Sequence, residues 1–266
     1  MGSSAFASPP FRKYLGGTLS ANIGFRMQSV ALAILVYRTT GSALDLGLVS
    51  AIGAAPAMLC NVLGGVLADR HDTRLIWAIN AGVSTMVVGA LALLVFVGDV
   101  PISQIYTLAA LMGIVAGVNV PVSQSYYPSL LAPHALKSGV TLNGMGMSVA
   151  SIIGPTLAGL IIATIDLYAA FAAAAICWSL PAFIALSLPT RKTKPGQNTR
   201  SLSDFRVGFD FIRTHRLFLI LIGLVVANFL LVFGWLQTLP AFIELFAGLE
   251  QERLGGRPAE RRGWGF

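Results

Sequence analysis

The sequence predicts an all-α membrane protein, and three observations support that fold class. Uncharged stretches of about twenty residues or more recur along the chain, and a stretch of that length crosses the hydrocarbon core of a bilayer as a helix. Of the 266 residues, 55% are hydrophobic and 11% are charged, whereas soluble domains carry about 25% charged residues. The basic residues stand in short loops between the apolar stretches, as in membrane proteins with several spans.

Seven stretches are long and apolar enough to span the bilayer. Glycine and proline inside them do not argue against helices, because neighbouring helices can satisfy the freed backbone groups. The predicted spans are residues 14–37, 46–68, 75–97, 102–125, 139–164, 167–188 and 217–239. We interpret the chain as an N-terminal tail (1–11), a six-helix bundle (12–188), a linker (189–216), a seventh transmembrane helix (217–240) and a polar C-terminal tail (241–266).

The basic residues also predict the orientation. Twelve of them fall before the first span or after the second, fourth and sixth spans, whereas the opposite loops up to the seventh span hold only Arg38. By the positive-inside rule the twelve are cytoplasmic, and the N-terminus lies inside. We expect an integral protein of a bacterial-type plasma (inner) membrane, surrounded by lipid. The net charge of +7 stands in its loops and does not indicate nucleic-acid binding.

The linker carries one amphipathic segment. Phe205, Phe209 and Ile212 recur at a helical spacing with charged residues between them, which predicts a helix lying on the inner membrane surface. Two interpretations stay open for it, a regulatory element or a plain connection between two helix bundles.

A polar stripe runs along the first span. Four residues at i, i+4, i+8 and i+11 share one face of an otherwise apolar helix. They are Thr18, Asn22, Arg26 and Ser29. Arg26 lies near the middle of the membrane, where inserting an arginine costs about 2.5–3.5 kcal/mol. We therefore expect Arg26 to face the bundle interior, where it either binds an anionic or oxygen-rich substrate or is bonded to helix carbonyls or to Asp45.

Polar residues of two other spans extend this predicted cavity. One face of the fourth span carries Asn119, Ser123 and either Tyr126 or Tyr127, and the seventh span carries Asn228 and Trp235. Each of them either forms a hydrogen bond between helices or contacts a ligand. The predicted cavity residues are Asn22, Arg26, Ser29, Asn119, Ser123 and Asn228.

The turn between the second and third spans has a recognisable pattern. It reads G-x-L-A-D-R-x-x-x-R from Gly65 to Arg74, which resembles the signature loop between the second and third helices of the major facilitator superfamily of transporters. The resemblance implies a cytoplasmic gate made by Gly65, Asp69, Arg70 and Arg74. Asp69 can accept backbone hydrogen bonds or meet the positive end of a helix dipole, and the arginines can pair with acids across the cytoplasmic seam. The alternative is that the glycine only packs and the charges are only solvated.

A second motif lies in the fifth span. The segment G-P-x-x-A-G, with Gly154, Pro155 and Gly159, resembles the Gly-Pro motif that exporters of this superfamily carry on helix five. Residues 40–43 (TGSA) and 46–49 (LGLV) are similar to the branch that contains enterobactin exporters and related drug exporters. The resemblance extends over about residues 11–240.

The resemblance implies a particular architecture. Members have two six-helix halves, a central cavity and alternating access by rocking of the halves. They have twelve helices, whereas this sequence offers seven, and residues 248–266 turn abruptly polar, with four arginines. We interpret the chain as truncated or frame-shifted after the seventh helix, with a natural short tail as the alternative.

Four positions depart from the family pattern. Asp72 and Thr73 stand where the signature loop usually has a glycine and a basic residue. Gly113 lies about where many proton-coupled exporters carry an arginine, and Ala150 replaces a glycine four residues before Gly154. The arginine motif of the fourth helix is therefore absent.

The residues do not identify what would drive transport. No carboxylate lies in the middle of the first six spans, so the proton is only a candidate coupling ion. The Walker A, His-Glu-x-x-His and Cys-x-x-Cys patterns do not occur, so we expect no enzyme activity, no cofactor and no metal. The predicted function is secondary active export of a small molecule of the drug or siderophore class. The alternative is a non-transporting remnant, or a membrane module that pairs with another half-transporter.

Overall fold

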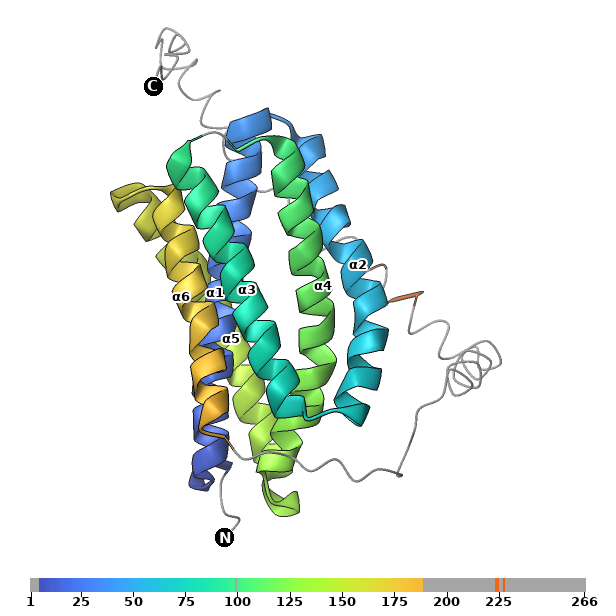
Figure 1. Ribbon diagram of the computed structural model, residues 1–266. Helices are drawn as coiled ribbons and strands as arrows, with labels where there is room; N and C mark the ends of the chain where they lie inside the picture. Colours follow the sequence, from blue (N-terminus) through green and yellow to red (C-terminus); the bar gives the residue numbers. More distant parts are fainter. Residues whose placement is uncertain (1–4, 99, 189–222, 225–226, 228–266) are drawn as a thin grey trace, which may run out of the picture. The chain divides into compact units, whose positions relative to one another are not determined.

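The computed structural model describes residues 5–98, 100–188, 223–224 and 227. The chain divides into two compact units, Met1–Ser201 and Leu202–Phe266, and the long helices of the described ranges all belong to the first. This unit is a helix bundle with no strand among its described residues (Figure 1). The linker and its amphipathic segment lie outside the described residues, as does the predicted seventh span apart from residues 223, 224 and 227.

Six helices in the described part of the chain are long and apolar enough to cross a membrane. They are α1 (Pro9–Thr40), α2 (Ala43–Arg70), α3 (Thr73–Val97), α4 (Ile102–Tyr126), α5 (Leu136–Thr164) and α6 (Leu167–Leu186). The first six predicted spans are thereby confirmed as helices, and most of the helices run a few residues beyond the predicted ends. They do so because a membrane helix continues from the hydrocarbon into the headgroup layer.

Helix α1 begins earlier than the hydrophobicity pattern indicated. The side chain of Ser8 accepts a hydrogen bond from the backbone N–H of Phe11, and two prolines fill the first two helical positions, where a missing N–H is harmless. A short 3₁₀ helix, η1 (Ala5–Ala7), precedes this cap, and Ala5 is buried. Much of the predicted N-terminal tail is therefore folded onto the bundle, because capping residues rather than apolar ones set where this helix starts.

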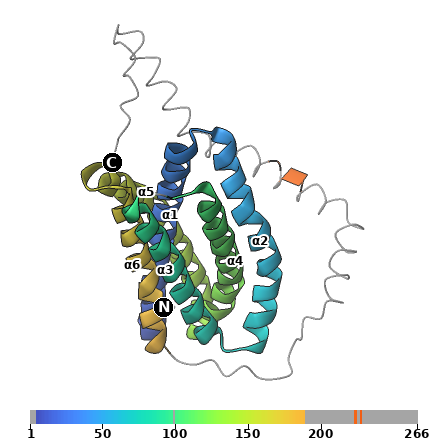
Figure 2. The same ribbon diagram turned by 45° about the horizontal axis from the view of Figure 1, so that its top comes forward.

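The helices follow one another around the bundle in the order α2, α4, α3, α6, α1, α5 (Figures 1 and 2). Helix α2 lies along α4, and α5 lies along α1. The two edge helices bury the smallest share of their apolar windows, 11% for α2 and 17% for α5 against 39% for the other four. Both edge helices therefore keep most of their surface uncovered by the described residues.

The helices cross closely where one of them has a glycine. A Cβ added at Gly113 of α4 would fall on the carbonyl oxygen of Gly53 in α2. A Cβ added at Gly24 of α1 would lie 2.9 Å from the carbonyl oxygen of Ala174 in α6. Such crossings are typical of membrane helices, whose association depends on close van der Waals packing.

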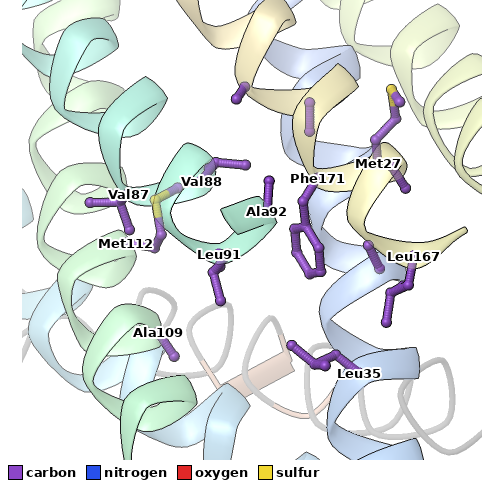
Figure 3. Close-up of a cluster of buried hydrophobic side chains, with 14 of the residues drawn as sticks. Met27, Leu35, Val87, Val88, Leu91, Ala92, Ala109, Met112, Leu167 and Phe171 are labelled. Carbon is purple, nitrogen blue, oxygen red and sulfur yellow. The ribbon is translucent and has the colours of Figure 1, made fainter. Parts of the chain in front are cut away.

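Two clusters of buried side chains form the core. One draws mainly on α1, α3, α4 and α6, with Leu46 and Val49 from α2 and Ala158 from α5, in the half of the bundle nearest the α1–α2 turn, and includes Leu91, Met112 and Phe171 (Figure 3). The other lies at the opposite end, around Tyr14 and Trp77. This second cluster is aromatic, since the Tyr14 ring lies 5.2 Å from the Trp77 ring, centroid to centroid.

Candidate functional site

The polar stripe of α1 lies on a face that remains partly open. Asn22 and Arg26 are half-buried, and Ser29 is exposed. Phe25, with 38% of its surface exposed, joins them, because positions 22, 25, 26 and 29 are neighbours on one face of a helix. The sequence interpretation missed Phe25, since an aromatic residue in an apolar span gives no polar signal. Its spacing of three residues from Asn22 is the signal that could have found it.

The Arg26 guanidinium packs against that aromatic ring. Its Cζ atom lies 5.9 Å from the centroid of the Phe25 ring, within the range of a cation–π interaction. The Ser29 hydroxyl donates a 2.8 Å hydrogen bond to the carbonyl oxygen of Phe25, so its own helix satisfies it. Arg26 therefore contributes the charge and most of the hydrogen-bond donors of this face.

Asp45 does not provide the counter-ion for Arg26. It lies in the first turn of α2, where its carboxylate accepts a 2.8 Å hydrogen bond from the hydroxyl of Tyr106. Arg26 stands fourteen residues before the end of α1 at Thr40. At 1.5 Å per residue this places the two residues about 20 Å apart along the helix axis, well beyond the reach of an arginine side chain. A bond between Arg26 and Asp45 is therefore excluded, because the two residues lie at different heights along the bundle. A bond from Arg26 to helix carbonyls stays a prediction.

On α4, Asn119 and Ser123 are bonded to each other. The Ser123 hydroxyl donates to the Asn119 side-chain oxygen across 3.1 Å, one helical turn away. The carbonyl oxygen of Ser123 accepts a 3.5 Å hydrogen bond from the hydroxyl of Tyr14 on α1. Both residues are half-buried, so the structure places this pair beside α1 at the aromatic end of the bundle.

Tyr126 and Tyr127 belong to the aromatic cluster. Both are buried, and their ring centroids lie 5.7 Å and 6.3 Å from that of Tyr14. Their rings therefore fill the space between α1, α3 and α4, and they contribute packing at this end of the bundle.

The signature segment is predicted as a turn, but it is helical up to Arg70, and the glycines Gly64 and Gly65 lie within α2, where they differ in their surroundings. A Cβ at Gly64 would lie 2.7 Å from the Pro121 side chain and 2.9 Å from the Val118 Cα, whereas Gly65 has open space around it. Gly64 thus allows the close approach of α2 to α4, whereas the glycine that belongs to the family motif is Gly65. Asp69 and Arg70 are both exposed at the end of α2.

Asp72 and Arg74 form hydrogen bonds at the N-terminal end of α3. The Asp72 side chain accepts a 3.0 Å hydrogen bond from the backbone N–H of Arg74 and so caps the helix, which gives a structural reason for its departure from the family pattern. The Arg74 guanidinium donates a 2.8 Å hydrogen bond to the carbonyl oxygen of Leu186, in the last turn of α6. A cation at a helix C-terminus is favourable, so Arg74 ties α3 to α6.

The Gly-Pro motif of α5 faces α1 at one glycine. A Cβ at Gly154 would fall against the Cβ of Arg26, closer than two carbon atoms can approach, whereas Gly159 has nothing within 4 Å. Pro155 lies inside α5, where it cannot donate the usual backbone hydrogen bond. Of the three motif positions, Gly154 is the one that meets the polar stripe.

Two further points concern the predicted site. Asn228 lies outside the described residues. Within residues 5–98 and 100–188, no group of three or more His, Cys, Asp or Glu side chains is placed to hold a metal ion.

Comparison with known proteins agrees with this architecture. The family model described as "Transmembrane secretion effector" matches residues 2–236. The staphyloferrin A transporter of Staphylococcus aureus is 27% identical over 211 residues, which cover 79% of this chain and 51% of that protein. The enterobactin exporter EntS of Escherichia coli is 22% identical over 204 residues, covering 77% and 49%. The multidrug efflux pump Tap of Mycolicibacterium fortuitum is 28% identical over 162 residues, covering 59% and 39%.

The chain spans about half the length, or less, of these curated relatives. The family match nevertheless includes all six described helices, the turn between α2 and α3, and the Gly-Pro motif of α5. Membership of this family, which is one of transporters and not of enzymes, together with the six apolar helices, identifies an integral membrane protein. The chain belongs to the transmembrane secretion effector family of the major facilitator superfamily.

Proposed function

We propose that this chain is a small-molecule exporter that works by alternating access. The observation that carries the proposal is Arg26, a charged residue about 2 Å from the midpoint of the 32-residue helix α1 at 1.5 Å per residue. Its face is partly open, and no described residue forms a salt bridge with it. A charge in the middle of a membrane helix is costly and therefore rare, and such ionisable residues mark substrate pathways.

The proposed substrate is an anionic or oxygen-rich small molecule of the siderophore or drug class. The Arg26 guanidinium offers a fork of donors that suits carboxylate or phenolate oxygens, and the exposed Phe25 ring beside it suits a flat apolar part of the same molecule. The relatives' names support the class, since they describe a staphyloferrin A transporter, an enterobactin exporter and a multidrug efflux pump. Asn22 and Ser29 share the face and complete the proposed contact.

Orientation, gating and coupling are parts of the same proposal. The protein lies in a bacterial inner membrane with its N-terminus on the cytoplasmic side. The exposed Asp69 and Arg70 act as the cytoplasmic gate. Protons are the proposed coupling ion. Collapse of the proton gradient with a protonophore is expected to abolish transport, and transport that persists at full rate would remove this part.

The central test is transport by the full 266-residue chain in inside-out vesicles, with staphyloferrin A and ethidium as probes. Arg26→Ala is expected to reduce the apparent affinity for the anionic probe about ten- to a hundredfold, since one hydrogen bond to a charged group contributes about 1.5–3 kcal/mol. Arg38→Ala, which removes an exposed arginine from the last turn of the same helix, is the matched control and is expected to change nothing. Equal effects of the two substitutions would contradict the role of Arg26.

A second candidate function is a half-transporter that needs a partner bundle. The observation that favours it is the uncovered surface of α2 and α5, which bury only 11% and 17% of their apolar windows against the described residues. The same assay separates the two candidates when the chain is tested alone and fused to the C-terminal half of the staphyloferrin A transporter. Transport by the fusion and not by the chain alone supports the second candidate.

A further inference from the structure

Gly154 meets α1 at the position of Arg26. A Cβ added at Gly154 would lie 3.1 Å from the carbonyl oxygen of Ile23 and 3.4 Å from the Cα of Arg26, and it would fall against the Arg26 Cβ. Helix α5 thus passes close to α1 at the residue that carries the intramembrane charge. Ala150 and Ala158, one turn before and one turn after, are fully buried, so small residues hold this crossing together on both sides.

The contact between α5 and α1 is made at the Cβ atom of Arg26, where its side chain begins. The first side-chain carbon of Arg26 lies against Gly154, and the guanidinium at the other end lies 5.9 Å from the centroid of the Phe25 ring. Because packed helices do not deform continuously, a methyl group at position 154 has to move either the Cβ of Arg26 or the whole of α5. Either movement shifts the rest of the Arg26 side chain. The guanidinium then takes a different position relative to the Phe25 ring.

We infer that Gly154 is a positioning residue that sets where the Arg26 guanidinium lies on the open face of α1. Gly154 touches no substrate and acts through Arg26. The inference rests on the proposed function only for its effect on transport, because the geometric relation among Gly154, Arg26 and Phe25 is measurable without any substrate.

The same motif provides a matched control. Gly159 lies in the same helix, five residues further on, and has nothing within 4 Å of an added Cβ. Gly154→Ala and Gly159→Ala therefore make the same chemical change in the same helix, and only the first introduces a methyl group at the Arg26 crossing. A general effect of removing a glycine from α5 would appear in both variants.

The first experiment places a single fluorine atom on the Phe25 ring, where its resonance reports the position of the Arg26 guanidinium. The full chain carries 4-fluorophenylalanine at position 25, and its ¹⁹F resonance is recorded in detergent micelles. Arg26→Ala is expected to shift the resonance because it removes the cation beside the ring. Gly154→Ala is expected to shift it as well, and Gly159→Ala is expected to leave it in place. In an Arg26→Ala background, Gly154→Ala is expected to add no further shift.

Two results of this experiment would overturn the inference. One is a resonance that Gly154→Ala leaves unchanged. The other is a shift of equal size with and without Arg26, which would mean that the methyl group acts on Phe25 by some other route. Neither result depends on whether the chain transports anything, so failure of the positioning role is distinguishable from failure of the proposed function.

The second experiment measures transport of staphyloferrin A by the full chain or its active fusion. Gly154→Ala is expected to raise KM about tenfold with little change in maximal rate, as for a misplaced charge-assisted hydrogen bond. Gly159→Ala is expected to keep the KM of the unmodified protein. A fall in maximal rate at constant KM, or equal changes in both variants, would show that Gly154 is only a packing residue.

Discussion

Gly113 illustrates how a neighbouring helix can decide the identity of a residue. Many proton-coupled exporters similar to this family carry an arginine at about this place in their fourth helix. In this chain a Cβ at position 113 would fall on the carbonyl oxygen of Gly53 and lie 3.0 Å from the Pro56 side chain. Helix α2 therefore occupies the space that a side chain at position 113 would need. Among the described helices, the charged residue nearest the middle of its helix is Arg26, on α1.

A substitution at Gly113 tests this packing. Gly113→Ala is expected to destabilise the bundle by about 1–3 kcal/mol, because an added methyl group in a packed interface forces the helices apart. Gly89→Ala on α3 is the control, since an added Cβ there has nothing within 4 Å. The control is expected to be neutral or slightly stabilising because alanine favours the helix. Unfolding in mixed micelles, followed by tryptophan fluorescence, gives the comparison, and equal stabilities would contradict the close crossing of α2 and α4.

The N-terminal element shows how one serine can join two parts of the chain. The Ser8 hydroxyl accepts a hydrogen bond from the Phe11 N–H and donates a 3.0 Å hydrogen bond to the carbonyl oxygen of Leu130. Leu130 ends the short 3₁₀ helix η2 (Tyr127–Leu130), which follows α4. The backbone N–H of Ala5 also lies 3.4 Å from the hydroxyl of Ser138 in α5. The start of α1 is therefore tied to the connection between α4 and α5.

Three substitutions at Ser8 separate the cap from the tie. Ser8→Thr retains both hydrogen bonds and is expected to behave like the unmodified protein. Ser8→Asp retains the cap, but a carboxylate cannot donate to the Leu130 carbonyl, so amide exchange is expected to rise at residues 129–131 only. Ser8→Ala loses both bonds, about 1 kcal/mol for the cap alone, and exchange is expected to rise in the first turn of α1 as well.

Hydrogen exchange read by mass spectrometry distinguishes these outcomes. Exchange at residues 129–131 that is the same in Ser8→Asp and Ser8→Thr would show that the hydrogen bond to Leu130 does not hold the connection.

In the first unit, Met1–Ser201, α2 and α5 are the first and last helices in the order of neighbours around the bundle. These are the helices with the smallest buried shares, 11% and 17%. The connections α2–α3 and α4–α5 lie at the aromatic end of the bundle, with η1, and the connections α1–α2 and α5–α6 lie at the other end. The basic residues of the first end predict that it is cytoplasmic.

Cysteine labelling tests this orientation on the whole molecule. In a background with Cys60→Ala and Cys177→Ala, Arg70→Cys and Lys137→Cys are expected to react only with a reagent that crosses the membrane. Ile165→Cys, whose side chain is 64% exposed between α5 and α6, is expected to react in intact cells with a reagent that does not cross it. Labelling of positions 70 and 137 from opposite sides would refute the topology.

The sequence by itself determined the fold class and the six described spans. Bilayer crossing requires an uncharged stretch of sufficient length, and this is a local property that can be counted along the chain. It also predicted that Arg26 shares a face with Asn22 and Ser29, because helical spacing alone sets which residues are neighbours on one helix. The spacing of the two motifs led to the family, which the match over residues 2–236 confirms.

Only the tertiary structure decided which partners these residues have. Asp45 pairs with Tyr106, 61 residues away, and Arg74 donates to Leu186, 112 residues away. Gly64 rather than Gly65 allows the close crossing with α4, and Gly154 rather than Gly159 meets Arg26. The rule of length and hydrophobicity applies to a membrane span as a whole. It therefore cannot distinguish the face of a helix that packs against a neighbour from the face that does not. The distinction arises only when helices from distant parts of the chain lie against each other.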